Sequence, residues 1–388
     1  MKRDDVTSGG GEPPLLTGVR VVELSQLLAA PLCGLTLADL GADVIKVEPR
    51  AGDETRRFPP FFANGESAWF HALNRGKRSV ALALSEPSGA TAVRRLIDSA
   101  DVVVENLGEA RSQLGIDWEG ARARNSKLVW CSITGLGAAS GGRAVDPSIQ
   151  AEIGLMATTG EPDGPPDRIQ APTIDVMTGM YAAQRVLAAL WRIERGGAGV
   201  FLDCALFDAA ATLTGTVGVL ALGGNTSLGR MGSASYLVSP SAAFETADGG
   251  HVLLIALTDE HWRGTCAALG HPEWADDPRC ADNAARLANR DLIHGWIGDA
   301  IATGTADHWV SALSGAGAIC APVRELADAW SQPRLTEREL LVTLAPPGFD
   351  SFPVPVMSLA RTVEADGLPA GPRLGEHTES VLGELGIR

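Results

Sequence analysis

The sequence predicts an α/β protein with two parts: a large domain built on a doubly wound, mostly parallel sheet, and a smaller α+β domain. Short runs rich in Val, Ile and Leu alternate with helical patterns in the first half of the chain, which is typical of a parallel sheet covered by helices. Segment 223–241 is rich in Gly and Ser and lacks clear periodicity, so it is predicted to link two domains. The length of 388 residues also exceeds one ordinary domain. The predicted large domain covers 15–222 and 340–388, and the small domain covers 242–339.

The first elements predict a βαβ unit. VRVVEL from Val19 is a strand candidate, PLCGLTLADL is a helix with Pro31 in its first turn, and DVIKVE is a second strand after a turn at Gly41. The alternation then repeats with SVALAL, a helix over 88–100, DVVVEN and KLVWCSIT. This repetition favours parallel pairing of the strands.

The rest of the chain predicts a long helix and then the small domain. The long helix is expected over 176–195, followed by the strand GVFLDCAL and a helix from Phe207. The small domain is predicted to open with a hairpin whose turn carries Asp248. Its helices are expected over 259–269, 283–303 and 306–316, and the chain after residue 346 is expected to return to the large domain.

The charge balance restricts the partners. With 32 Lys and Arg against 47 Asp and Glu, the net charge is −15, which would repel nucleic acid and anionic membranes. The most apolar stretch, 213–222, is about half the length that spans a bilayer, and the polar start of the chain has no signal-peptide pattern. We therefore expect a cytoplasmic protein with no nucleic-acid or membrane partner.

Common cofactor and nucleophile motifs are missing from the sequence. The six cysteines lie far apart without a CxxC pair or a histidine at ligand spacing, so no metal site is expected. The first turn reads SQLLAAPLCG and not GxGxxG, the Gly76-Lys77 pair is followed by Arg78, and no GxSxG is intact. These absences disfavour a Rossmann dehydrogenase, a P-loop kinase and an α/β-hydrolase.

Two features could carry chemistry, and each has a plainer alternative. Between Arg56 and Arg78 there are five basic residues and one acidic residue, which fits either a phosphate-bearing ligand or a solvated basic turn. Asp175 precedes the predicted long helix, so it is either an N-cap that accepts the amide of a residue such as Thr178 or a nucleophile that the helix dipole keeps ionised.

Several segments together closely resemble class III CoA-transferases, the family of formyl-CoA transferase and carnitine CoA-transferase. The matching strings, in chain order, are LTGVRVVELSQLLAAPLCGLTLADLGADVIKVEP, NRGKRSVALAL, ADVVVENL, DPSIQAEIGLMATTGEPDGPP, IDVMTGMYAAQRVLAAL and FETADG. The resemblance implies a homodimer of two chains threaded through one another as interlocked rings. It also implies a CoA thioester as substrate, with no prosthetic group, and a carboxylic acid as acceptor.

The resemblance places site residues on this sequence. The nucleophilic aspartate of the family falls on Asp175. The family's CoA contacts fall on Leu27, Leu28, Leu82, Asn106, Leu107, Leu114, Arg143 and Asp146. The predicted CoA-binding set also includes Arg50, Lys77 and Arg78, and Arg111 as a substitute for an arginine that is Gln113 here.

Departures from the family pattern bear on the substrate and the reaction. Formyl-CoA and oxalyl-CoA members have glutamine at the position of Leu28, which argues against a small oxalate-like acceptor. The racemase branch of the family has a histidine directly before the aspartate of RAVDPSIQ, and Val145 stands there in this chain. Without an imidazole, two-base proton exchange lacks a partner, whereas acyl transfer needs one nucleophile. We therefore expect a CoA-transferase that works through aspartyl anhydride and aspartyl-CoA intermediates. A 2-methylacyl-CoA racemase or other CoA-ester isomerase, and a silent CoA-binding protein, remain the alternatives.

Overall fold

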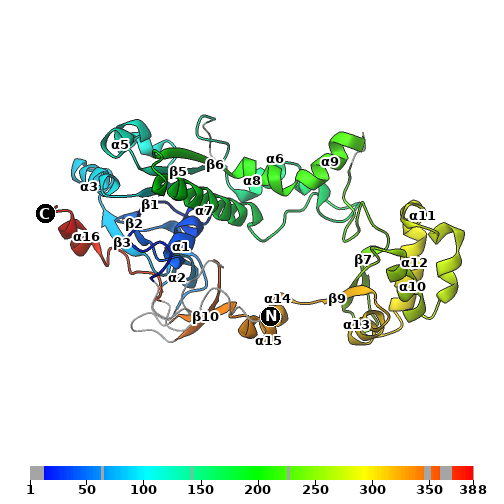
Figure 1. Ribbon diagram of the computed structural model, residues 1–388. Coiled ribbons are helices and arrows are strands. Elements are labelled where there is room, and N and C mark those ends of the chain that lie inside the picture. The colour runs from blue at the N-terminus through cyan, green and yellow to red at the C-terminus, as the bar shows by residue number, and fades with distance from the viewer. Residues whose placement is uncertain are drawn as a thin grey trace. The chain divides into compact units, whose positions relative to one another are not determined.

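The structure is a computed structural model that divides into two compact units (Figure 1). It describes residues 13–62, 65–140, 142, 144–224, 228–344, 351–358 and 369–387. The first unit holds the described residues within Met1–Ile153, Ile169–Asn225 and Pro333–Arg388, and the second holds those within Gly154–Arg168 and Thr226–Gln332. The second unit therefore includes 154–168 and begins before the predicted boundary at 242, and the chain rejoins the first unit at Pro333.

A mostly parallel sheet forms the centre of the first unit, as predicted. Its six described strands are β1 (Arg20–Leu24), β2 (Asp43–Pro49), β3 (Arg78–Leu82), β4 (Val102–Glu105), β5 (Val129–Thr134) and β6 (Val200–Ala205). All neighbouring pairs are parallel, in the order β3-β2-β1-β4-β5-β6. The chain thus winds outward from β1 in one direction and from β4 in the other.

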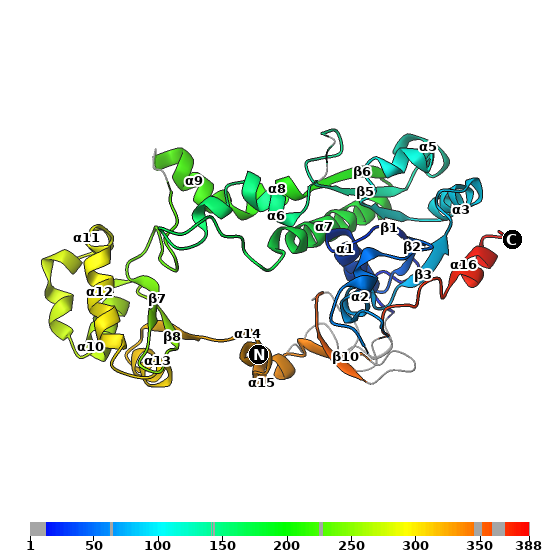
Figure 2. The ribbon, with the colours of Figure 1, turned by 180° about the vertical axis from the view of Figure 1, so that it is seen from behind.

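Helices cover both faces of this sheet because its strands are apolar on both sides (Figures 1 and 2). Along β4, Val102 and Val104 belong to a core shared with α1 (Ala29–Asp39), α7 (Thr173–Glu194) and α8 (Leu206–Leu213). Val103 faces the opposite core, which it shares with α3 (Pro87–Asp98), α5 (Trp118–Arg124) and α16 (Thr378–Glu384). Val381 of α16 is fully buried there, so the C-terminal segment returns to the first unit.

Shorter elements complete the first unit. They are α2 (Ala68–Asn74), α4 (Ala110–Gln113), α6 (Asp146–Glu152), α9 (Gly215–Gly224), α15 (Pro333–Glu337) and the antiparallel pair β10 (Leu341–Leu344) and β11 (Phe352–Pro355). Within the described ranges, no single helix is both long and apolar enough to cross a membrane; α8 and α9 pass such a test only as a pair, bent by 65°.

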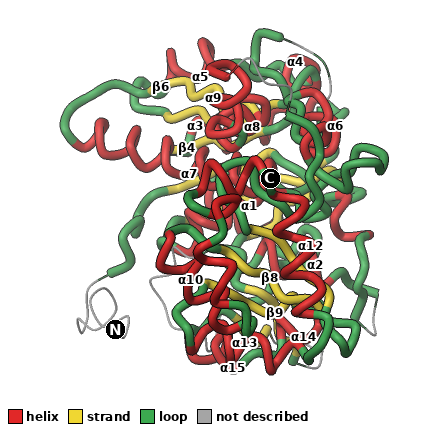
Figure 3. Tube along the Cα trace, turned by 90° about the vertical axis from the view of Figure 1, so that its right-hand side faces the viewer, coloured by secondary structure: helices red, strands yellow, loops and turns green. Residues whose placement is uncertain are grey.

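The second unit is a three-stranded antiparallel sheet covered by helices (Figure 3). Its strands are β7 (Ser241–Glu245), β8 (His251–Ile255) and β9 (Ile319–Val323), and its main helices are α10 (Asp259–Ala268), α11 (Asn283–Ala288), α12 (Arg290–Ile301), α13 (Ala306–Gly315) and α14 (Leu326–Trp330). The predicted hairpin is confirmed, because Glu245 pairs with His251 around the Asp248 turn. The predicted helix over 283–303 is interrupted at Asn289, and β9 was not predicted.

Candidate active site at the carboxyl edge of the sheet

The carboxyl ends of β1 and β4 lie side by side at the point where the winding direction reverses. In open parallel sheets, ligands bind in the crevice outside the strands at this switch point. The loop after β1 carries Leu27 and Leu28, and the loop after β4 carries Asn106 and Leu107. The topology therefore brings four of the predicted CoA contacts to one edge.

The Asn106 side chain holds the loop after β1 in place. Its Oδ1 accepts the backbone N–H of Gln26 at 3.1 Å, and its Nδ2 donates to the Gln26 carbonyl at 2.8 Å. The next residue, Leu27, has a φ of 70° and is 36% exposed. A left-handed conformation is costly for a side chain such as leucine and occurs where the surrounding structure enforces it, often at a functional site.

Buried charges lie beneath this loop. Lys46 Nζ lies 3.0 Å from Glu23 Oε1 and 2.8 Å from Asp53 Oδ2, and donates to the Ser25 carbonyl. Burial by itself would lower the pKa of Lys46, but these two carboxylates outweigh burial and raise that pKa above its usual range. Asp53 Oδ1 also receives the Leu27 N–H at 3.5 Å. This buried network supports the loop from below.

Lys77, a predicted CoA contact, belongs to the same network. Its Nζ lies 2.8 Å from Glu23 Oε2, the Pro31 carbonyl and Asn74 Oδ1, and its side chain is fully buried. Burial lowers the pKa of Lys77 to about 8, against the raising effect of Glu23. Gly34 makes room for this pair, since a Cβ there would collide with Glu23 Oε2. All three donor positions of the ammonium are used inside the protein.

Internal partners also neutralise most of the other basic residues between Arg56 and Arg78, which argues against a phosphate pocket built from this segment. Arg56 pairs with Glu48 and stacks on Phe70, with its guanidinium carbon 3.6 Å from the ring centroid. Arg78 pairs with Asp43 and Glu384, and Arg75 with Asp39. Arg50, at the end of β2, is exposed at the carboxyl edge. Arg143 lies outside the described residues.

The predicted leucine contacts are mostly core residues. Leu28, Leu82 and Leu114 are 6%, 7% and 5% exposed and pack in apolar clusters, so their side chains offer little surface to a ligand in this chain. Leu107 is half-buried. Arg111 lies 3.1 Å from Glu105 Oε1, and Glu105 also accepts the Leu107 N–H at 2.9 Å. Glu105 thus connects Arg111 to the loop after β4.

Asp175 lies in the first turn of α7, so the plainer alternative, that Asp175 is the N-cap of this helix, is wrong. The helix begins at Thr173, three residues earlier than expected. The cap comes from another element: Asp146 Oδ2 accepts the backbone N–H groups of Ile174 at 2.8 Å and Asp175 at 3.1 Å. Asp146, a predicted CoA contact, is 3% exposed, and its carboxylate has this internal role in the structure.

Burial raises the pKa of Asp175 to about 7, and the neighbouring Asp146 carboxylate adds to the increase. Desolvation and this like charge thus act against the helix dipole, which favours the ionised form of a carboxyl group at a helix start. A carboxyl group with this pKa beside a ligand crevice is a candidate for catalysis.

Packing of α7 against α1 brings Asp175 toward the switch-point loop. Val176 packs against the apolar cluster that includes Leu28 and Leu32 at the start of α1. One turn further along α7, a Cβ on Gly179 would approach the Ala29 carbonyl to 2.6 Å, so only glycine allows this contact. Val145, at the position of the racemase histidine, is 52% exposed directly before α6. An apolar side chain there offers no proton-transfer group.

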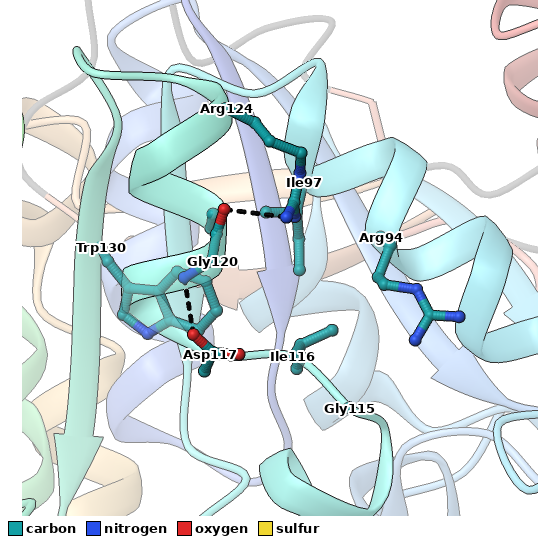
Figure 4. A pocket seen from close by; sticks show the side chains of 9 residues that line it. Arg94, Ile97, Gly115, Ile116, Asp117, Gly120, Arg124 and Trp130 are labelled. Carbon is teal, nitrogen blue, oxygen red and sulfur yellow. Dashed lines mark hydrogen bonds between the residues drawn. The ribbon is translucent and has the colours of Figure 1, made fainter.

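A separate small hollow lies between α3 and α5, on the face of the sheet opposite α1 and α7 (Figure 4). Asp117 accepts the Gly120 N–H at 2.6 Å in its wall, and Arg124 donates to the Gly120 carbonyl. Arg94 also lines it. It contains none of the predicted site residues.

Comparison with known proteins fits this arrangement. Residues 16–378 match the family described as CoA-transferase family III. The chain belongs to this family. It is 36% identical to a succinate–glutarate CoA-transferase of Agrobacterium fabrum and 35% identical to a succinyl-CoA:mesaconate CoA-transferase of Haloarcula hispanica, over 96% of each chain in both cases. A CaiB/BaiF family protein from Brucella suis superposes with a TM-score of 0.82 at 33% identity, covering 96% of this chain and 100% of the other.

The family membership makes this chain a CoA-transferase whose substrates are an acyl-CoA and a carboxylic acid.

Three residues of the site were not predicted from the sequence: Gln150, Glu23 and Lys46. Glu23 and Lys46 left a signal: each is a charged residue flanked by apolar residues inside a strand of a buried parallel sheet, a pattern that predicts buried ion pairs. Gln150 left no such signal in the sequence, since a glutamine on a short helix is usually solvated.

Proposed function

We propose that this CoA-transferase moves CoA from a succinyl-CoA-type donor to a dicarboxylic acid, with Asp175 as the nucleophile. The half-buried Asp175 carboxyl group carries the proposal: it lies in the first turn of α7, beside Val176, which packs against the cluster that holds Leu28 of the loop after β1. Two relatives at 36% and 35% identity bear the names succinate–glutarate and succinyl-CoA:mesaconate CoA-transferase, which supports the dicarboxylate class.

The reaction begins when an Asp175 oxygen attacks the thioester carbon of the donor. The C–S bond breaks, CoA leaves as a thiolate, and a mixed anhydride remains on Asp175. The thiolate then attacks the aspartyl carbonyl carbon, releases the donor acid and forms an aspartyl-CoA thioester.

The acceptor reverses these two steps. Its carboxylate attacks the aspartyl thioester, CoA leaves as a thiolate and a new mixed anhydride forms. The thiolate then attacks the acyl carbon of the acceptor, which yields the new CoA thioester and restores the Asp175 carboxylate. Both intermediates are activated acyl species, so the energy of the thioester is conserved while water is excluded.

Acyl-CoA donors assayed against mono- and dicarboxylic acids, with the CoA products identified by mass spectrometry, test the proposal. We expect succinyl-CoA with glutarate or mesaconate to give a new thioester faster than acetyl-CoA with monocarboxylates. Asp175→Ala should reduce exchange by at least about 10³-fold and leave CoA binding in place. Exchange confined to monocarboxylates would contradict the substrate class, and near wild-type turnover of Asp175→Ala would contradict the nucleophile.

We further propose the interlocked homodimer that the family resemblance implies. The first unit exposes apolar side chains that a second copy could cover: Met180, Trp191, Val219 and Leu222 are 49%, 62%, 69% and 91% exposed. The chain also leaves the first unit twice, at 154–168 and 226–332, before it returns. Sedimentation at micromolar concentration should give twice the mass of 40.4 kDa, and an active monomer would contradict the proposal.

A further inference from the structure

Two side chains of α6 fasten the backbone that leads into α7. Asp146 Oδ2 takes the N–H groups of Ile174 and Asp175, and its other oxygen, Oδ1, accepts from Gln150 Nε2 at 2.5 Å. Gln150 is 1% exposed and forms hydrogen bonds with the backbone further upstream. Its Oε1 accepts the Ile169 N–H at 2.9 Å, and its Nε2 lies 3.1 Å from the Ile169 carbonyl. Both ends of segment 169–175 are therefore tied to α6.

This arrangement determines what the Asp175 side chain is left to do. An aspartate near the start of a helix commonly turns back to accept a free backbone N–H of the first turn. Here Asp146 already accepts two of those N–H groups. No group in the described part of the chain donates a hydrogen bond to the Asp175 carboxylate in this structure, so its oxygens are not committed to a cap.

We infer that Asp146 and Gln150 are positioning residues for the transfer reaction: they cap α7 from a neighbouring helix and so hold the Asp175 carboxylate uncapped for attack on the acyl group. The inference rests on the proposed role of Asp175. Neither residue touches the substrate in this scheme. Each acts through the backbone at the start of α7, where a small displacement of the nucleophile costs much of the rate.

The charged groups around Asp175 make this role measurable. Asp146 is the acidic neighbour that acts on Asp175. The other charged residues on the helices packed against the start of α7 have different surroundings: Asp39, near the end of α1, pairs with Arg75, while Glu152 on α6 and Asp208 on α8 are exposed. Replacing Asp146 by a neutral residue therefore changes the dominant field at Asp175.

Four variants test the inference. Gln150→Ala removes the link to Ile169 and retains the Asp146 charge, and we expect kcat to fall about tenfold with little change in KM. Asp146→Ala removes the cap of α7 itself, and kcat should fall about 100-fold. Asp146→Asn retains an oxygen for the two N–H groups, and the rising limb of kcat/KM should move down by about one pH unit. Glu152→Ala, exposed on the same helix, is the matched control and should stay within about twofold of wild type.

A second measurement works without turnover. Carbodiimide labelling of Asp175, followed by peptide mass spectrometry across pH, reports the titration of its carboxyl group directly. Its midpoint should move down in Asp146→Asn and stay unchanged in Glu152→Ala.

The inference is overturned if Gln150→Ala and Asp146→Asn both retain wild-type kcat and the labelling midpoint does not move. A loss of folded protein with an unmoved midpoint in the remaining folded fraction would also overturn it, because that outcome marks a purely structural role. If Asp146→Ala does not fold, Asp146→Asn and Gln150→Ala decide the question. Failure of the proposed function looks different: the wild type would label at Asp175 near neutral pH and yet exchange no CoA.

Discussion

The side-chain amide of Asn106 pairs with the backbone of Gln26 like a neighbouring strand, accepting its N–H at 3.1 Å and donating to its carbonyl at 2.8 Å. This contact joins the loops after β1 and β4, which flank the switch point of the sheet. The left-handed conformation of Leu27 follows directly after it. We conclude that Asn106 fixes the backbone of the loop after β1, in addition to any contact with CoA.

Asn106→Ala should therefore impair activity more than stability. We expect a stability loss of about 1–2 kcal/mol from the two lost hydrogen bonds and at least a tenfold loss in kcat/KM, because the loop can relax away from Leu27's strained conformation. Asn125→Ala is the matched control, since Asn125 also donates to one backbone carbonyl and accepts one backbone N–H, but at the opposite edge of the sheet. Equal losses of kcat/KM in the two variants would refute the role of Asn106.

Asp175→Asn should stabilise the protein at alkaline pH. The folded-state pKa of Asp175 is raised to about 7 from an ordinary value of 3.8, so the folded state binds a proton that the unfolded state releases between these values. The free energy of unfolding of the wild type consequently falls as pH rises from about 4 to about 7 and then levels off. The variant lacks this penalty. Its free energy of unfolding should exceed that of the wild type by about 2–4 kcal/mol at pH 8, with little difference at pH 4.

Denaturant unfolding at a fixed protein concentration checks this pH dependence. Asp208→Asn is the control, because Asp208 is exposed on α8, and it should change the free energy of unfolding by under about 0.5 kcal/mol. A stability gain for Asp175→Asn that is the same at pH 4 and pH 8 would argue against a raised pKa.

Lys77→Met should unfold the protein more easily by about 3–5 kcal/mol, because it leaves the Glu23 carboxylate buried with one ion-pair partner fewer. Lys127→Met, at an exposed lysine of the same unit, should cost under about 0.5 kcal/mol. Thermal unfolding and CoA binding distinguish the two roles that the sequence allowed for Lys77. Weaker CoA binding with unchanged stability would restore the phosphate-contact hypothesis.

The protein should not racemise 2-methylacyl-CoA substrates. Val145 cannot accept or deliver a proton, and Asp175 alone could return a proton only to the face from which it came. Incubation of a chiral 2-methylacyl-CoA in deuterated water, without a carboxylate acceptor, tests this directly. Rapid inversion with deuterium incorporation would move the chain to the racemase branch.

Much of the fold could be predicted from the sequence because it depends on local patterns. The alternation of apolar runs and helical segments gave the parallel sheet with helices on both faces, and the Asp248 turn gave the β7–β8 hairpin. Strand β9 and the break at Asn289 were missed. The first is paired with a strand more than 60 residues earlier, and the second interrupts a pattern that would suit one continuous helix.

The sequence by itself determined the family, the α/β class and the identity of Asp175 as the candidate nucleophile, since these depend on residue types and their order along the chain. Only the tertiary structure decided which residues of the chain pair with one another. Lys77 pairs with Glu23 across 54 positions of sequence, and Asp146 caps a helix that begins 27 residues later. Ionic partners and helix caps are set by distance in space, and burial then fixes the charge on each group. For that reason the same basic residue that suggests a phosphate contact in the sequence is a buried structural cation in the fold.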